Sequence, residues 1–310
     1  MLVVTHSGRF HADDVLGYAI LRAALGEQFA FRRSRDPGVI AAADLAFDVG
    51  GGPYDHHMRD GGERRTDGTP YSAAGLLWRD FGRQALATWL PVGADATIID
   101  CIWRMLDETL IVAIDRIDNG CEAARPDSVV RMLGAFNPPW NADRSADACF
   151  ADAAAMAATW IRRAAEQACA TASAAALVLA AVQPDTPKII ELPAPMPWID
   201  AAHTHGLPVL YALYPERAPS DGSSSWIVAT MPTEPGGLLP RQPLPECWAG
   251  LADDRLRAVT GVADAVFCHR NRFLAVASSR SGAYQLIAAA QAASDGATDD
   301  LNDEKPHLAT

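Results

Sequence analysis

Short apolar runs alternate with amphipathic segments over the first fifty residues, and this alternation restricts the possible folds strongly. Leu2–Thr5 is an apolar run of strand length, and Ala12–Leu25 carries apolar residues at helical spacing. Two further strand-like runs follow, at residues 29–33 and 45–49. A strand, a helix and two more strands joined by short turns predict an α/β fold, with an open, mainly parallel sheet flanked by helices.

Histidines and aspartates gather where these predicted strands end. His6 follows the first strand, and Asp48 lies at the end of the third. In open α/β sheets, ligands bind at the carboxyl ends of the strands. Four of the eight histidines lie within the first 57 residues, which is denser than chance placement on a surface would give. The clustered candidates are His6, His11, Asp13, Asp48, Asp55, His56 and His57.

The chemistry of this set predicts a metal site. A mixture of imidazole and carboxylate suits Mn²⁺, Co²⁺, Zn²⁺ or Fe²⁺ better than Ca²⁺, which prefers oxygen ligands alone. One ion needs three or four of these groups, so the larger number of candidates predicts two metals that share a carboxylate. Such a pair activates a water and clamps the attacking and leaving oxygens of a phosphoryl displacement. Asp115 and Asp118 lie three residues apart on one helix face and are alternatives for a further ligand.

The rest of the chain predicts a second, smaller domain. Helices are expected at 72–81, 96–117 and 146–176, and five prolines between residues 184 and 197 mark the passage into the second domain. Strands are expected at 209–214, 226–230, 265–268 and 273–277, before a last helix at 284–293. These patterns predict a first domain at 1–174, an α/β or α+β domain at 175–293, and an acidic, disordered tail at 294–310.

Composition restricts the partners and the compartment. The formal charge is −12, which argues against a broad basic face for a long nucleic-acid duplex and favours short substrates. The six cysteines form no C-x-x-C pair, so buried, reduced thiols are expected. The first residues lack the pattern of a signal peptide, and the apolar stretch at 168–182 is too short to span a bilayer. We therefore expect a cytoplasmic protein with no membrane partner.

Several motifs together resemble the melanocyte-proliferating-gene family. They read THSGRFHADD at 5–14, FDVGG at 47–51, YDHH at 54–57, SAAGL at 72–76 and IDNG at 117–120. The resemblance continues through 244–251 and 266–269 and covers the chain up to about residue 293. That family is similar to a branch of the DHH phosphoesterase superfamily, which includes RecJ-type exonucleases, oligoribonucleases and family II pyrophosphatases. The resemblance implies a DHH-like catalytic first domain and a substrate-binding second domain.

The resemblance also implies a division of the metal ligands. One metal would be held by His6, His11 and Asp48, and the second by a set that shares Asp48. An Asp commonly stands in the superfamily where this chain has His11, so Mn²⁺ is favoured, with Mg²⁺, Co²⁺ or Zn²⁺ as alternatives. The second set is Asp13, Asp48, His56 and Asp118, with Asp115 as the alternative to Asp118.

Roles for the neighbouring residues follow from the same resemblance. His57 would contact the substrate phosphate or donate a proton to the leaving group, and Asp55 would orient a histidine. Relatives carry a Gly-rich stretch after the last His motif, which residues 271–277 lack, so substrate recognition departs from the family pattern. The candidates for substrate binding are Arg59, Arg64 and Arg65 after the His pair, with Arg241 and His269 in the second domain.

The predicted function is a metal-dependent phosphoesterase, foremost a 3′→5′ exonuclease on RNA or short oligonucleotides. A cleft between two domains suits a single-stranded end. One alternative is hydrolysis of a small phosphate compound such as pyrophosphate or a nucleotide, for which Arg241, Arg270 and Arg272 are available. Another is a metal-binding protein without turnover. The sequence leaves open whether the protein forms a homodimer.

Overall fold

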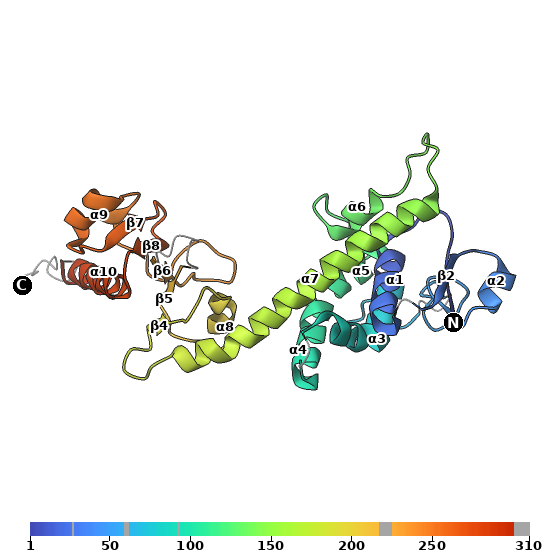
Figure 1. Cartoon of the computed structure of the whole chain (residues 1–310), viewed down its shortest axis with the longest axis horizontal. Helices are drawn as coiled ribbons and strands as arrows, with labels where there is room; N and C mark the ends of the chain where they lie inside the picture. The colour runs from blue at the N-terminus through green and yellow to red at the C-terminus, as the bar shows by residue number, and fades with distance from the viewer. Residues whose placement is uncertain (27, 59–61, 92–93, 217–224, 301–310) are drawn as a thin grey trace, which may run out of the picture. The chain divides into compact units, whose positions relative to one another are not determined.

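A computed structural model describes residues 1–26, 28–58, 62–91, 94–216 and 225–300, with side chains up to residue 293. The chain divides into two compact units, Met1–Ala172 and Ser173–Thr310, where the sequence predicted a boundary at 174. Helix α7 (Ala146–Ala181) runs through this division (Figure 1). Each unit is described by itself below.

The first unit contains a parallel sheet. Its strands are β1 (Leu2–Thr5), β2 (Ala30–Arg33) and β3 (Leu45–Ala46), in the order β2-β1-β3. Both pairs are parallel, which confirms the predicted α/β class and brings the carboxyl ends of the three strands to one edge. Strand β3 is shorter than expected, because the chain leaves the extended conformation at Asp48, where φ is 54°.

Helices cover this sheet in an order close to the predicted one. Ser72 caps α3 by accepting a hydrogen bond from the backbone N–H of Gly75, and the helix runs eight residues past its predicted end. The helix expected at 96–117 contains a π-helical segment, Asp107–Ile111. The short helices α2 and α6 were not predicted. The bounds are α1 (Ala12–Leu25), α2 (Pro37–Ala41), α3 (Ala73–Trp89), α4 (Ala96–Leu106), α5 (Val112–Asp118) and α6 (Val129–Gly134).

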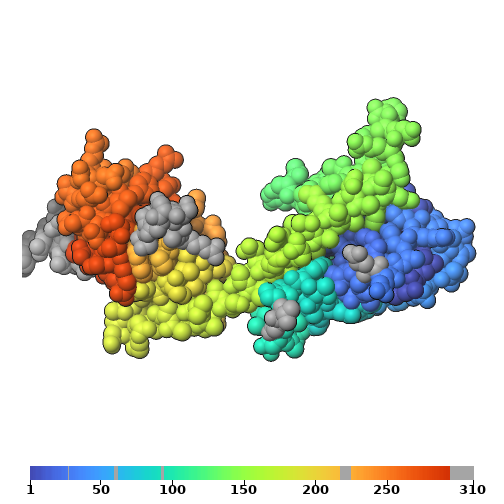
Figure 2. Space-filling view, viewed as in Figure 1, coloured from blue at the N-terminus to red at the C-terminus, as the bar shows by residue number. Residues whose placement is uncertain are grey.

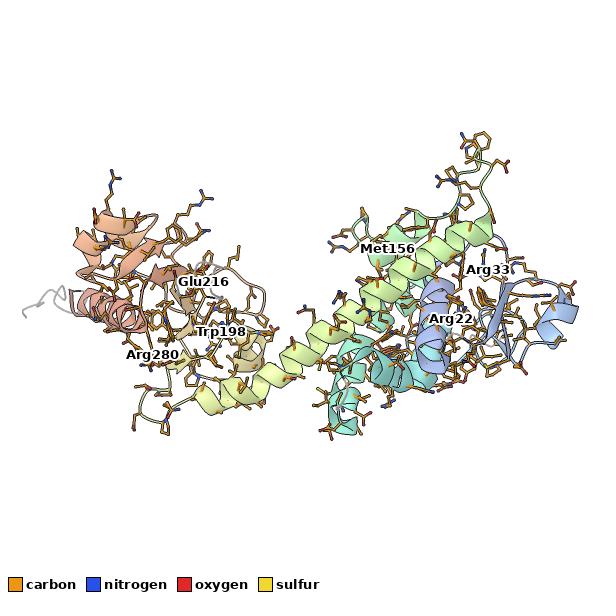
Figure 3. All side chains as sticks on the ribbon, in the orientation of Figure 1. Arg22, Arg33, Met156, Trp198, Glu216 and Arg280 are labelled. Carbon is orange, nitrogen blue, oxygen red and sulfur yellow. The ribbon has the colours of Figure 1, made fainter. Side chains whose placement is uncertain are left out.

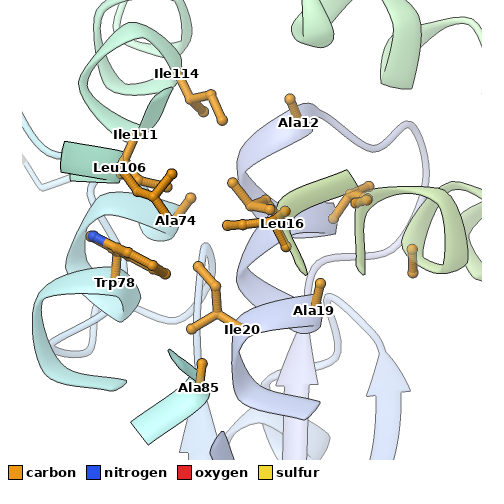
Figure 4. Close-up of a cluster of buried hydrophobic side chains, with 14 of the residues drawn as sticks. Ala12, Leu16, Ala19, Ile20, Ala74, Trp78, Ala85, Leu106, Ile111 and Ile114 are labelled. Atoms are coloured by element: carbon orange, nitrogen blue, oxygen red, sulfur yellow. The ribbon is translucent and has the colours of Figure 1, made fainter. Parts of the chain in front are cut away.

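The core of the first unit forms where α1 packs against α3 and the helices that follow it (Figure 4). Leu16 and Ile20 of α1 are fully buried opposite Trp78 of α3. Gly17 permits this close approach, because a β-carbon there would lie 2.8 Å from Cδ1 of Leu77. The packing fixes the first turn of α1, which carries Asp13 and Asp14, relative to α5.

Helix α7 belongs to the cores of both units. Phe150, Ala157 and Ile161 pack into the core of the first unit, and Val178 packs beside Ile190 in the second. Figure 2 shows α7 lying over the N-terminal elements. The helix is longer than predicted, and its length and apolar composition alone would also allow it to cross a membrane. Burial in the two cores accounts for only part of its apolar residues, because 22% of its most apolar 18-residue stretch is buried and Leu177 and Leu179 are exposed.

The second unit is built on a mixed five-stranded sheet in the order β4-β5-β6-β8-β7. Strands β4 and β5 are parallel and the other pairs antiparallel, as expected for a small α/β or α+β unit. Strand β4 lies inside the proline-rich passage and was not predicted. The strands are β4 (Ile189–Glu191), β5 (Tyr211–Pro215), β6 (Trp226–Thr230), β7 (Ala265–Cys268) and β8 (Leu274–Ala277); the helices are α8 (Trp198–Thr204), α9 (Asp253–Thr260) and α10 (Arg280–Asp300).

Two smaller predictions need correction. Helix α10 continues to Asp300, so the first seven residues of the expected disordered tail are helical, and 301–310 lie outside the described residues. All six cysteines are free, as predicted. Cys101, Cys121 and Cys247 are exposed, however, so only part of the set behaves as buried thiols.

Candidate metal centre

The loop after β1 and the first turn of α1 supply half of the site. His6 directly follows the strand, and His11 occupies the N-cap position of α1. Oδ1 of Asp14 accepts a hydrogen bond from the backbone N–H of His11 at 3.0 Å, which closes the first turn. Asp13 and Asp14 are both fully buried. The helix N-terminus stabilises nearby negative charge, but two buried carboxylates need further compensation.

Asp48 lies at the centre of the site. The parallel pairing of β1 and β3 brings it beside His6, with His6 Nε2 3.1 Å from Asp48 Oδ2. Its other oxygen, Oδ1, lies 3.2 Å from Nε2 of His56. The left-handed backbone at Asp48 is tolerated better by Asp and Asn than by most residues. One buried carboxylate therefore contacts a histidine on each side.

The Gly50–Gly52 turn brings the second histidine pair to the sheet edge. The backbone N–H of Asp48 donates to the carbonyl of Tyr54 at 2.9 Å, which folds the segment back. The carboxylate of Asp55 accepts from the backbone N–H groups of Gly51 and His57. It also lies 2.9 Å from Nδ1 of His57. Burial opposes ionisation, yet these hydrogen bonds and the His57 ring lower the pKa of Asp55.

The end of α5 completes the site. Oδ2 of Asp118 lies 3.2 Å from Nε2 of His56. The other ring nitrogen of His56, Nδ1, is 3.3 Å from Oδ1 of Asn119, an orientation that a metal-binding histidine commonly receives from a neighbouring group. Asn119 was not predicted, although its place directly after Asp118 is the signal that could have revealed it.

The electrostatics of the site call for cations. Neither oxygen of Asp13 has a hydrogen-bond donor among the described residues, although the side chain is fully buried. Burial and the charges of Asp48 and Asp118 raise the pKa of Asp13. Burial acts to lower the pKa of His6, but Asp14 and Asp48 raise it to about 10. Buried carboxylates without donors, next to imidazole nitrogens, fit divalent transition-metal ions.

The ligand atoms fall into three groups, within each of which they lie no more than 4.8 Å apart. Asp48 belongs to two of the groups, as expected for a shared carboxylate. The grouping differs from the predicted division, because His11 stands with Asp13 rather than with His6, and Asp14 replaces it beside His6. The groups are His6–Asp14–Asp48, Asp48–His56–His57 and His11–Asp13–Asp118.

Asp14 was missed by the sequence reasoning. Its Oδ2 lies 3.1 Å from Nε2 of His6, while Oδ1 caps α1. The signal was available in the sequence, because an acidic residue three positions after an N-cap histidine often accepts from that residue's backbone N–H.

Asp115 and Asp118 have different surroundings in the structure, and only Asp118 lies at the metal site. The carboxylate of Asp115 accepts hydrogen bonds from both the backbone and the hydroxyl of Ser72 and from Nε of Arg65 at 2.6 Å. Burial raises the pKa of Asp115, although Ser72 and Arg65 act against this shift. Asp115 therefore fixes the start of α3 to α5, and its contacts do not support the alternative that made it a metal ligand.

The predicted phosphate contact of Arg65 also needs correction. Its guanidinium binds both oxygens of Asp107 and one of Asp115, and it packs on the ring of Tyr71. These interactions occupy the side chain within the fold. Arg64 is exposed and donates to the carbonyl of Gly68, and Arg59 lies outside the described residues.

Two residues that the sequence did not reveal hold the loop between His6 and His11 in place. Asn137 donates to the carbonyl of Phe10 and accepts from its backbone N–H, at 2.8 and 3.0 Å. Arg33, labelled in Figure 3, stacks on Phe150 and donates to the carbonyl of Gly8 at 2.7 Å. Both reach the loop from distant parts of the chain, so sequence spacing alone could not identify them.

We predict that Asn137→Ala weakens both the fold and metal binding. It leaves two buried backbone groups of Phe10 without partners, at a cost of about 1–3 kcal/mol each. The melting temperature should fall by about 2–4 °C per kcal/mol, and the apparent affinity for Mn²⁺ should fall with it. Asn141→Ala, at an exposed position, is the control. Thermal unfolding and Mn²⁺ titration test this, and equal behaviour of the two variants would contradict it.

Two cavities flank the cluster within the first unit. The larger, about 740 Å³, borders His11, His56, His57 and Asp118 and extends to α6. The smaller, about 220 Å³, borders His6, Asp48 and His57 on another side. Arginines that were not predicted line both: Arg9 and Arg131 in the larger cavity, and Arg35 in the smaller.

The two residues of the second unit that were predicted to bind substrate, Arg241 and His269, form hydrogen bonds with neighbouring backbone groups. Arg241 donates through Nη1 to the carbonyls of Leu207 and Val209. Nδ1 of His269 accepts from the backbone N–H of Asn271, and its ring packs against Phe273 at 4.3 Å between centroids. The contacts of Arg241 are therefore structural, while Nε2 of His269 has no hydrogen-bond partner among the described residues.

The fold and the His and Asp cluster define a mixed α/β protein with a site suited to divalent cations. The model MYG1_exonuc, described as an uncharacterised protein family (UPF0160), matches residues 2–291, so the chain belongs to this family, as its motifs indicated. The MYG1 protein C694.04c of Schizosaccharomyces pombe is 30% identical over 92% of this chain and 95% of its own length. The MYG1 exonucleases of Mus musculus and Homo sapiens are 29% and 28% identical over 92% of this chain and cover 83% and 84% of their own.

A comparison with solved structures found the pGpG-specific phosphodiesterase PggH of Vibrio cholerae. It covers 89% of this chain and 92% of its own, with 13% identity and a TM-score of 0.30. A TM-score this low supports no argument about function.

Proposed function

We propose that this protein is a metal-dependent phosphoesterase, acting as a 3′→5′ exonuclease on RNA or short oligonucleotides. The observation that carries the proposal is the buried carboxylate of Asp48 between His6 and His56, beside a buried Asp13 without hydrogen-bond donors. The names of the mouse and human relatives, MYG1 exonucleases, support the choice of reaction. The formal charge of −12 favours short substrates over a long duplex.

The ions would be held by residues of the three ligand groups: His6, His11, Asp13, Asp14, Asp48, His56 and Asp118. The motifs that carry these residues resemble those of DHH phosphoesterases. Two divalent cations, with Mn²⁺ favoured, would supply an activated water and neutralise charge on the phosphate. Asp48 lies beside His6 through one oxygen and beside His56 through the other, which favours two ions over one.

His57 is the candidate proton donor. Its side chain is 62% exposed and lines both cavities, so a substrate can reach it. The carboxylate of Asp55 holds Nδ1 at 2.9 Å and is itself fixed by two backbone N–H groups. This contact favours the tautomer that donates from Nδ1 to Asp55, which would leave Nε2 facing the leaving oxygen of the substrate.

A substrate panel tests the reaction. With Mn²⁺, the protein should shorten a single-stranded RNA of a few nucleotides from its 3′ end and release nucleoside monophosphates. RNA with a blocked 3′ end, the matching DNA, a dinucleotide and pyrophosphate are the comparisons. Hydrolysis of pyrophosphate alone would replace the exonuclease proposal with a small-molecule phosphohydrolase, and turnover of none of them would leave a metal-binding protein.

Removal of metal gives a further prediction. Chelation should abolish hydrolysis, and Mn²⁺ should restore it with about two ions bound per chain. Because the ions bind the folded chain, a hundredfold excess of Mn²⁺ over its Kd should stabilise the fold by about 2.7 kcal/mol for each bound ion. Ca²⁺ at the same concentration should stabilise it less, since histidine ligands disfavour Ca²⁺. Elemental analysis and thermal unfolding measure both effects, and full activity in metal-free protein would refute the assignment.

A further inference from the structure

We infer that the larger cavity of the first unit binds the terminal nucleotide of an oligonucleotide, with Arg9 and Arg131 as its phosphate contacts. This inference rests on the proposed function and deepens it, because it names the part of the substrate that lies beside the metal centre. The cavity lies wholly within the first unit.

The size of the cavity argues against a phosphate-sized substrate. Its volume is about 740 Å³, within the range of about 300–1,000 Å³ found for sites that enclose whole small molecules. The neighbouring cavity, about 220 Å³, already offers room beside His6 and Asp48 for a small group. The larger space therefore fits the nucleoside that is attached to a phosphate at the metal centre.

The lining of the cavity has three kinds of surface that the binding of a nucleotide needs. His56 and Asp118 form the end nearest the metal centre. Ile117 and Val130 are among the apolar side chains that could pack on a base or ribose. Asn119 adds an amide, although its own contacts with His56, Pro70 and Asp115 restrict its position.

The two arginines differ from those that form ion pairs within the described part of the fold. Arg33, Arg65 and Arg79 each pair with a carboxylate. Arg9 and Arg131 are exposed and have no carboxylate partner within 4.0 Å among the described residues. Among the described residues, the side chain of Arg131 hydrogen-bonds only to the carbonyl of Ala124, at 3.4 Å. In a chain with a net charge of −12, unpaired arginines beside a cavity are available for an anion, and guanidinium binds phosphate oxygens in pairs.

The double variant Arg9→Ala/Arg131→Ala tests the inference in the full-length, Mn²⁺-loaded protein. A trinucleotide, bis(p-nitrophenyl) phosphate and the product analogue 5′-AMP are the probes. We expect KM for the trinucleotide to rise at least tenfold with a smaller change in kcat, the pattern of lost ground-state binding. The loss in kcat/KM should be at least fivefold larger for the trinucleotide than for bis(p-nitrophenyl) phosphate, and the Kd of 5′-AMP should rise about tenfold.

Arg104→Ala/Arg144→Ala is the matched control. Both arginines are exposed in the same unit and line neither cavity, so this variant loses the same two positive charges away from the proposed site. The control should behave as the wild-type protein with all three probes. Equal losses on the two substrates, or unchanged binding of 5′-AMP, would overturn the inference.

The test separates failure of the inference from failure of the proposed function. If the wild-type protein hydrolyses no phosphodiester, the proposed function is wrong, and equilibrium binding of 5′-AMP alone decides the cavity. Binding that the double variant loses would support a nucleotide site. Absence of binding to wild-type protein would overturn it.

Discussion

Asp48→Asn is expected to lower turnover of any phosphodiester by several orders of magnitude while the fold stays intact. Asp48 contacts His6 and His56 through its two oxygens and belongs to two of the three ligand groups. A neutral amide removes the negative charge that both cations would share, and two-metal activation supplies much of the reduction in the barrier. The Mn²⁺ content should fall below two ions per chain.

Asparagine is the appropriate substitution because of the backbone. Asp48 has a φ of 54°, and Asn tolerates the left-handed region as Asp does, whereas Ala would add strain. The structural perturbation is therefore small. Metal-dependent turnover, elemental analysis and circular dichroism of the variant are the measurements.

The control for this prediction is Asp143→Asn, at an exposed aspartate of the first unit. It removes the same charge and should keep wild-type turnover and metal content. Near-normal turnover in a folded Asp48→Asn protein would remove Asp48 from the site and the shared-carboxylate assignment with it.

The elements that carry the first half of the site were predictable because local patterns determine them. The bounds of β1 and α1 match the expected ranges, 2–5 and 12–25. Parallel pairing of β1 and β3 then brings His6 and Asp48 together, because the carboxyl ends of parallel strands lie at the same edge of a sheet. Asp48 could be placed near His6 without any knowledge of side-chain packing.

The residues that could not be assigned from the sequence depend on distant contacts. Asp115 and Asp118 share a helix face, and only packing distinguishes them. The position of Arg65 after the His pair suggested phosphate binding. Its partner Asp107 lies 42 positions away in the sequence, so only the fold reveals the ion pair. Arg9 and Arg131 are likewise brought to one cavity only by the tertiary fold.

Secondary structure failed where local propensity was weak or misleading. Residues 294–300 are polar and acidic, which suggested disorder, but they continue the helix begun at Arg280. Strand β4 lies among prolines, where strand formation is disfavoured, and its pairing with β5 sets its conformation.

Asp115→Ala is expected to be strongly destabilising, with an effect on stability and not directly on chemistry. The carboxylate is fully buried and satisfies Ser72 twice and Arg65 once. Removing one member of a buried pair typically costs about 3–5 kcal/mol, because the remaining polar groups lose their partner. At about 2–4 °C per kcal/mol, the melting temperature should fall on the order of 10 °C.

Gly75→Ala tests, by a different substitution, how the buried cluster of Asp115, Ser72 and Arg65 contributes to stability. A β-carbon at Gly75 would overlap both carboxylate oxygens of Asp115, and the backbone of α3 cannot easily move away. Overpacking of this kind costs about 1–3 kcal/mol. The variant should therefore lower the melting temperature while every polar group of the cluster is still present.

Asp118→Asn is the contrast that separates structural from metal-binding carboxylates. The charge of Asp118 opposes ionisation of Asp13, so neutralising it should relieve repulsion in metal-free protein and leave the melting temperature equal or slightly higher. The affinity of this variant for Mn²⁺ should fall at least tenfold, because Asp118 lies beside His56 and in the group with His11 and Asp13.

Asp115→Ala should show the reverse pattern. Without metal it should lose much of its thermal stability, and at a temperature where it is folded it should bind as many Mn²⁺ ions as the wild type. Thermal unfolding without metal, followed by Mn²⁺ titration, distinguishes the two. A stable Asp115→Ala protein that has lost one ion would reverse the assignment and make Asp115 the ligand.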